Sequence, residues 1–244
     1  MKNEARQRLI FALDVDAFAE AEKWVRQLHG QVGVFKVGKQ LFTRCGPEVV
    51  QMVRAEGGEV FLDLKYHDIP NTVAMAGVEA CRLGVRMFNV HALGGREMMA
   101  RTVAEVDARY PRGSKERPLL LAVTILTSSS EETLREVGIE RPVREMVPRL
   151  ARLAQEAGMD GVVASPQEVD LIRAACGADF AIVTPGVRPA SAALDDQKRV
   201  MTPGEAIAAG ADYLVIGRPI SAAADPVEAA ERILDEMALA LGRP

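Results

Sequence analysis

The chain has 244 residues, of which 48% are hydrophobic and 26% charged, an ordinary globular composition at a length that suits one α/β barrel. Its 30 basic and 34 acidic residues leave a net charge of -4 with no long block of either sign, so we expect no nucleic-acid partner and no membrane surface. The first ten residues lack an apolar signal segment, and no stretch approaches the roughly 18 apolar residues of a membrane helix, which predicts a cytoplasmic protein.

Eight short apolar runs, in chain order, alternate with longer segments of helical periodicity. The runs cover residues 9–13, 34–37, 60–64, 87–90, 119–125, 161–164, 181–183 and 213–216. Segments such as 17–28, 47–55, 72–83 and 96–109 are long enough for helices with one apolar face. This alternation is typical of βαβ units on a parallel sheet, and eight strands favour closure. We therefore predict an α/β fold, a single-domain (β/α)8 TIM barrel that spans residues 1–244.

Two helix starts and one loop support this order of elements. Thr202, Pro203 and Glu205 have the spacing of a capping box with proline at the first helical position. Asp225 before Pro226 opens the last helix in the same way. The polar stretch 110–117 is predicted to be an exposed loop between a helix and a strand.

The cysteines and histidines indicate neither a disulfide framework nor a metal site. The three cysteines are far apart and in no C-x-x-C spacing, so we interpret them as small packing residues. The three histidines form no close metal-binding pair. These residues are Cys45, Cys81, Cys176, His29, His67 and His91.

A cluster of acids and lysines marks the end of the third predicted strand, where a barrel of this kind places its active site. Because strand side chains alternate between faces, Asp63 and Lys65 point the same way, into the mouth of the barrel. Asp68 follows the strand, and Lys36 ends the neighbouring strand. The four groups are expected to alternate in charge, so that each favours the charged form of its neighbour. The alternative is an ion-pair network that only fixes strand register, although apolar residues would stabilise such a site as well or better.

A second candidate site lies after the seventh and eighth predicted strands. Residues 184–189 contain a glycine and two prolines, and the eighth strand leads directly into Gly217 and Arg218. Loops at these positions commonly bind phosphate, since glycine allows close approach of the backbone and arginine pairs with phosphate oxygens. The alternative is a tight turn with a solvated arginine. The polar segment 195–199 is a candidate lid that brings Gln197 to the phosphate.

Other polar residues at strand ends carry weaker signals. Asn89 and His91 end the fourth strand, and a lone histidine is more often structural than catalytic. Thr127 and Ser128 follow the fifth strand, where they either bond a polar ring edge or cap the next helix.

A set of motifs that covers nearly the whole chain resembles the orotidine 5'-phosphate decarboxylase family. The motifs are Phe11-Ala12-Leu13-Asp14, Lys36-Val37-Gly38, Asp63-Leu64-Lys65, Asp68-Ile69-Pro70-Asn71-Thr72, Thr184-Pro185-Gly186-Val187-Arg188-Pro189, Asp196-Gln197 with Arg199, and Ile216-Gly217-Arg218-Pro219. The resemblance implies a carbon-carbon lyase that converts orotidine 5'-phosphate to UMP and CO2, the last step of de novo pyrimidine synthesis, with no cofactor and no metal. It also implies that Lys36, Asp63, Lys65 and Asp68 form the catalytic charge network, with Lys65 as proton donor.

The resemblance further implies a homodimer with shared sites. Asp68 and Thr72 would reach across the interface, and Thr72 would join Asp14 and Lys36 at the ribose. The pyrimidine would bond Thr127 or Ser128, and the phosphate would bind at the ends of strands seven and eight. The implied substrate-binding residues are Asp14, Lys36, Ile69, Thr72, Thr127 or Ser128, Arg188, Gln197, Gly217 and Arg218.

Three alternatives remain open. A sugar-phosphate decarboxylase or aldolase of similar architecture would hold an enediolate on a divalent metal. A Schiff-base aldolase would need a neutral lysine, whereas Asp63 and Asp68 should keep Lys65 protonated. An inactive phosphate-binding barrel would keep Gly217 and Arg218 and lose the lysine network.

Overall fold

The computed structural model describes residues 1–189 and 201–242, which form a closed barrel of eight strands in chain order. Every strand pairs in parallel with the next, and β1 pairs with β8 to close the ring. The strands are β1 (Leu9–Ala12), β2 (Val34–Gly38), β3 (Glu59–Tyr66), β4 (Met87–His91), β5 (Leu119–Val123), β6 (Gly161–Val163), β7 (Ala181–Pro185) and β8 (Tyr213–Ile216). The predicted (β/α)8 barrel is confirmed.

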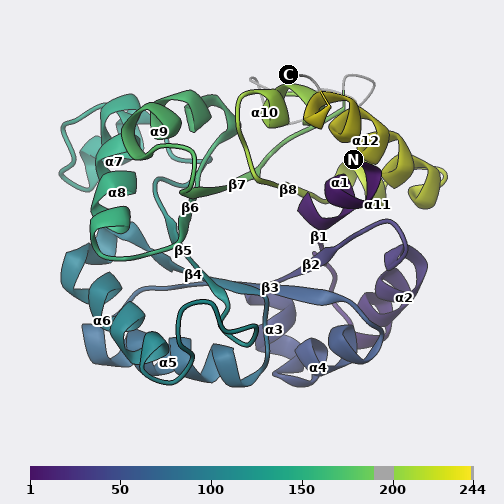
Figure 1. Ribbon diagram of the computed structural model, residues 1–244, viewed down its shortest axis with the longest axis horizontal. Helices are drawn as coiled ribbons and strands as arrows, with labels where there is room; N and C mark the ends of the chain where they lie inside the picture. The colour runs from purple at the N-terminus through teal and green to yellow at the C-terminus, as the bar shows by residue number, and fades with distance from the viewer. Residues whose placement is uncertain (190–200, 243–244) are drawn as a thin grey trace.

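Helices surround the strands on all sides (Figure 1). They are α1 (Lys2–Arg8), α2 (Phe18–Leu28), α3 (Lys39–Cys45), α4 (Glu48–Ala55), α5 (Pro70–Arg82), α6 (Gly95–Asp107), α7 (Glu131–Glu136), α8 (Val143–Glu156), α9 (Val169–Cys176), α10 (Pro203–Ala208), α11 (Arg218–Ser221) and α12 (Pro226–Leu241). The sequence does not predict α1, because Ala5 is its one buried residue and no apolar periodicity marks it. This helix packs against α12, so the two ends of the described chain lie together.

The two predicted caps fix the helices on either side of β8. Thr202 Oγ1 accepts the backbone N–H of Glu205 at 3.2 Å, and the Glu205 carboxylate accepts the N–H of Thr202 at 2.8 Å. Asp225 Oδ1 accepts two backbone N–H groups in the first turn of α12, each at 3.0 Å. Caps of this type contribute about 1 kcal/mol each, so they set where α10 and α12 begin.

The loop before β5, predicted to be exposed, contains a charged side chain that is buried. The side chain of Arg117 is only 6% exposed and forms ion pairs with Asp107 and Asp160, each at 2.7 Å. Asp160 also accepts the backbone N–H of Leu120 at 2.8 Å. Because its two acidic partners lie on other elements, Arg117 holds the loop against the starts of β5 and β6.

Two apolar layers stabilise the barrel, one between the strands and the helices and one inside the ring. The inner layer consists of Ile10, Ala12, Val34, Phe61, Met87, Leu121, Val123, Val163, Val183 and Val215. At the N-terminal end of the strands, Arg86 pairs with Glu59 and donates to the Tyr213 hydroxyl at 3.4 Å across the ring. Side chains therefore fill the inside of the ring from its N-terminal end, and open space remains at the C-terminal end of the strands. No helix of the described residues is long and apolar enough to cross a membrane.

Candidate active site

Asp63 lies between two lysines at the C-terminal end of the barrel. Its Oδ1 accepts from Lys65 Nζ at 2.6 Å, and its Oδ2 lies 3.7 Å from Lys36 Nζ. Lys36 Nζ also donates to Asp14 Oδ1 at 3.0 Å, so acids and lysines alternate along Asp14, Lys36, Asp63 and Lys65. The side chains of Asp63 and Lys36 are each 12% exposed, whereas that of Asp14 is 68% exposed at the rim. Lys36, Asp63 and Lys65, three of the four residues predicted to form the charge cluster, therefore meet in this chain.

A bulge in β3 brings Lys65 to Asp63. The pairing of β3 with β4 shifts between Leu62 and Tyr66, and Lys65 has a φ of 52°, in the left-handed region. Regular alternation predicts that these side chains point the same way, and they do meet. They meet, however, on irregular backbone, because the extra residues of the bulge re-aim the strand end.

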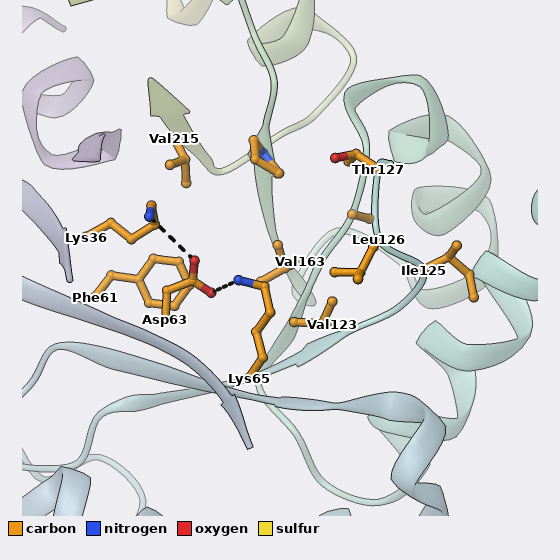
Figure 2. A pocket seen from close by; sticks show the side chains of 12 residues that line it. Lys36, Phe61, Asp63, Lys65, Val123, Ile125, Leu126, Thr127, Val163 and Val215 are labelled. Carbon is orange, nitrogen blue, oxygen red and sulfur yellow. Dashed lines mark hydrogen bonds and ion pairs between the residues drawn. The ribbon is translucent and has the colours of Figure 1, made fainter. Parts of the chain in front are cut away.

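A cavity of about 250 Å³ opens beside these charges (Figure 2). Lys36, Asp63 and Lys65 form one wall, with the Asp63 carboxylate pointing toward both lysines. Most of the remaining lining is apolar: Phe61, Val123, Ile125, Leu126, Val163, Ala164, Pro185 and Val215. Thr127 also lines the cavity, whereas Ser128 is exposed and outside the lining. Of the two hydroxyl residues left open by the sequence, Thr127 has the placement of a ligand contact.

Asp68, Ile69 and Thr72 do not join this cavity within one chain. All three are exposed where β3 leads into α5, and Asp68 Oδ1 accepts the backbone N–H of Ile69 at 2.6 Å. Among the residues described by the structure, Asp68 has no lysine or arginine as an ion-pair partner. Only three of the four predicted network residues therefore meet in a single chain.

The predicted phosphate-binding residues lie at the ends of two neighbouring strands, β7 and β8. Arg188 is buried, and its backbone N–H bonds the carbonyl oxygen of Met201 at 3.2 Å. Gly217 precedes α11, and a Cβ there would lie 3.3 Å from the Cβ of Ala12, so the backbone packs closely against β1. Arg218 begins α11 and is exposed. Gln197 and the rest of segment 195–199 lie outside the described residues.

Asn89 is a site residue to which the sequence assigns no role. It is fully buried on β4, its Nδ2 donates to Asp63 Oδ1 at 2.7 Å, and its Oδ1 accepts the backbone N–H of Lys65 at 2.8 Å. The sequence signal that could have identified Asn89 is an amide at the end of a predicted strand, because a polar side chain buried inside a barrel requires hydrogen-bond partners.

His91 follows Asn89 by two residues on β4, so both side chains lie on the same face of the strand. The ring of His91 packs at a tilt against the ring of His67, with the ring centroids 5.5 Å apart. Burial, followed by repulsion from His67, lowers the pKa of His91 to about 4. The imidazole is therefore neutral at pH 7. Among the described residues, no three His, Cys, Asp or Glu side chains group so as to hold a metal ion.

The sequence pattern of the orotidine 5'-phosphate decarboxylase / HUMPS family matches residues 7–233. This chain belongs to that family. Family members with closely similar sequences include an orotidine 5'-phosphate decarboxylase from Syntrophotalea carbinolica, 73% identical over 238 residues and covering 98% of each chain. Another, from Geobacter sulfurreducens, is 67% identical over 236 residues, which is 97% of this chain and 98% of the relative.

Solved structures of the family share the fold over nearly the whole chain. The orotidine 5'-phosphate decarboxylase from Lactobacillus acidophilus superposes with a TM-score of 0.83 at 40% identity, covering 94% of this chain and 98% of that chain. The decarboxylase from Pyrococcus horikoshii superposes with a TM-score of 0.73 at 26% identity. The barrel fold that positions the acid and lysine cluster is therefore shared with these members of the family.

Proposed function

We propose that this chain is a carboxy-lyase that converts orotidine 5'-phosphate to UMP and CO2, the last step of pyrimidine nucleotide synthesis, without a metal ion or cofactor. Family membership and the names of relatives up to 73% identical support this activity. The observation that carries it is the position of Asp63 between two lysines on one wall of an otherwise apolar cavity.

Loss of CO2 from a pyrimidine ring poses an electrostatic problem. When the bond between the ring carbon and the carboxylate breaks, both electrons remain in an orbital in the ring plane, where the π system cannot delocalise them. A fixed positive charge beside that carbon lowers the barrier, and the Lys65 ammonium, held by Asp63 at 2.6 Å, supplies it. Lys65 Nζ then donates a proton to the ring carbon, and solvent returns a proton to the amine.

The apolar wall suits a flat aromatic ring better than a polyhydroxylated chain. Val123, Val163 and Val215 face the charged wall, and Thr127 at the edge offers a hydroxyl to the polar edge of the ring. Apolar surroundings also strengthen the interaction between the ammonium and the developing negative charge, because they exclude water.

The rest of the nucleotide extends toward β1, β7 and β8. Asp14 at the rim, with Lys36 bonded to it, would hold a ribose hydroxyl, and Gly217 lies against β1 next to Asp14. Arg188 and Arg218, with Gln197, are the proposed phosphate ligands. These contacts lie far from the bond that breaks, so their binding energy can position the ring and need not merely tighten binding.

A homodimer would complete the charge network. Asp68 and Thr72 are exposed, and Ile69 beside them is an apolar side chain that is 67% exposed. Leu93, in the short 3-10 helix after neighbouring β4, is 44% exposed. An apolar surface around Asp68, which has no ion-pair partner among the described residues, suits a two-fold contact in which each chain places Asp68 in the other's site.

The first experiment follows the absorbance of orotidine 5'-phosphate after addition of purified protein in EDTA. We expect conversion to UMP by the wild type, a loss of more than about 10²-fold in Lys65→Ala, and full activity in Lys23→Ala, whose exposed lysine lies on α2. No conversion would refute the proposal. Turnover of a sugar phosphate only after addition of magnesium would instead establish the metal-dependent sugar-phosphate decarboxylase or aldolase, which the sequence leaves open as an alternative.

The shared site is tested by mixing two inactive variants. If Asp68 serves the partner subunit, a heterodimer of Lys65→Ala and Asp68→Ala chains contains one intact site and one doubly altered site. Random exchange of subunits should then restore about a quarter of the wild-type activity. Absence of any recovery, with subunit exchange verified by mass spectrometry, would contradict the shared site.

A further inference from the structure

Asn89 occupies a position inside the barrel where an apolar residue would be expected. Its partner in the register with β5 is Leu121, a member of the inner apolar layer, and Asn89 itself has no exposed surface. It is also absent from the lining of the cavity, so it has no surface with which to bind a ligand there. A buried amide is costly unless its polar atoms are bonded, and those of Asn89 bond two groups of the proposed active site.

One amide joins the backbone of Lys65 to the side chain of Asp63. The bulge removes Lys65 from the regular ladder between β3 and β4, and Asn89 Oδ1 accepts its N–H at 2.8 Å in place of a ladder carbonyl. Nδ2 of the same side chain donates to Asp63 Oδ1 at 2.7 Å. The orientation of the amide is unambiguous, because a backbone N–H can only donate and a carboxylate can only accept.

These two bonds decide how the charges of the site are aimed. Asp63 Oδ1 receives both Asn89 Nδ2 and Lys65 Nζ, which leaves Oδ2 facing Lys36. Lys65, at a φ of 52°, is held in a backbone conformation that L residues rarely adopt. Without the amide, no hydrogen bond from Asn89 would hold the Asp63 carboxylate in one rotation or the backbone of the bulge against β4.

We infer that Asn89 is a positioning residue for the proposed decarboxylation: it fixes the Asp63 carboxylate and the Lys65 backbone so that the ammonium reaches the ring carbon. This inference rests on the proposed function. Asn89 acts through its two neighbours and touches no substrate. Its loss should therefore lower kcat and leave KM nearly unchanged, because the cavity lining and the phosphate ligands stay in place.

The test compares Asn89→Leu, Asn89→Asp and a control. Leucine keeps the size of the side chain and makes neither bond, so we expect kcat to fall on the order of 10²-fold, the effect of a misplacement of about 1 Å. Thr102→Val removes another fully buried polar group, whose hydroxyl donates to the carbonyl oxygen of Met98, and should leave kcat unchanged. Hydrogen exchange of the peptide that contains Lys65 should speed up in Asn89→Leu and not in Thr102→Val.

Asn89→Asp separates positioning from packing through pH. A protonated aspartate can donate to Asp63 and accept from the Lys65 N–H as the amide does, whereas an ionised one repels Asp63. The kcat of Asn89→Asp relative to wild type should rise as the pH falls from about 8 to about 6, while the ratio for Asn89→Leu stays flat.

The outcomes distinguish the two proposals. A wild type that does not convert orotidine 5'-phosphate ends the proposed function, and this inference with it. An active wild type with Asn89→Leu within about twofold of its kcat, or with equal losses and parallel pH profiles in both variants, would overturn the role of Asn89 alone. If Asn89→Leu does not fold, the pH profile of Asn89→Asp decides.

Discussion

Glu168 is a half-buried carboxyl whose ionisation should weaken the fold. It lies at the end of the short turn after β6, where its Oε2 accepts the backbone N–H of Ser165 at 3.1 Å. Burial raises the pKa of Glu168 from its ordinary 4.5 to about 7, and the Ser165 N–H opposes this only in part. No ion pair with another described residue offsets the burial.

The magnitude and sign follow from proton linkage. Below about pH 4.5 the carboxyl is protonated in both the folded and the unfolded chain. Between pH 4.5 and about 7 the unfolded chain ionises first, so the free energy of unfolding falls as the pH rises and levels off above about 7. At about 1.4 kcal/mol for each pKa unit, the loss is about 3 kcal/mol.

The variant Glu168→Gln isolates this effect, because glutamine can still accept from Ser165 and has no proton to lose. Urea unfolding of both proteins, at one protein concentration, should give similar free energies near pH 4.5. Near about pH 8 the variant should be more stable by about 3 kcal/mol. A difference that does not change with pH would refute the reasoning, since it would mean that the pKa of Glu168 is the same in the folded and the unfolded chain.

Three further predictions concern single residues. A Cβ on Gly38 would lie 3.2 Å from Lys36 Nζ, so Gly38→Ala should displace the ammonium and lower kcat by about tenfold, whereas Gly30→Ala, with open space around its Cβ, should not. Burial raises the pKa of Cys81 to about 12, so the thiolate fraction at pH 8 is on the order of 10⁻⁴ and labelling by Ellman's reagent should require unfolding. In an NMR titration, His91 should stay neutral down to about pH 5, and a midpoint near 6.5 would contradict its burial.

The strands and the acid and lysine cluster are predictable from the sequence because their signals are local. Each of the eight apolar runs coincides with a strand of the barrel within a few residues. The spacing of Asp63 and Lys65 places both on one face of a strand, and Lys36 on the neighbouring strand follows from parallel order. Closure of the ring then brings the strand ends together without further information.

The bulge and its support are not predictable, because they depend on residues distant in the chain. Alternation predicts a regular strand through Lys65, whereas the backbone there is left-handed and held by Asn89, 24 residues later. The same limit hides Arg117, whose carboxylate partner Asp160 lies 43 residues further on. Local patterns register a polar residue in each case and say nothing about what it bonds.

The buried and half-buried charged groups at the two ends of the barrel differ in the partners that they bond. At the N-terminal end, Asp160 and Asp212 precede β6 and β8, and each pairs with an arginine while accepting a backbone N–H of the neighbouring strand. At the C-terminal end, Lys36 and Lys65 both pair with Asp63 and all three still face a cavity. The left-handed backbone of Lys65 costs about 1 kcal/mol. Charges satisfied by the backbone stabilise the fold, whereas charges held in strained geometry beside open space are available for chemistry.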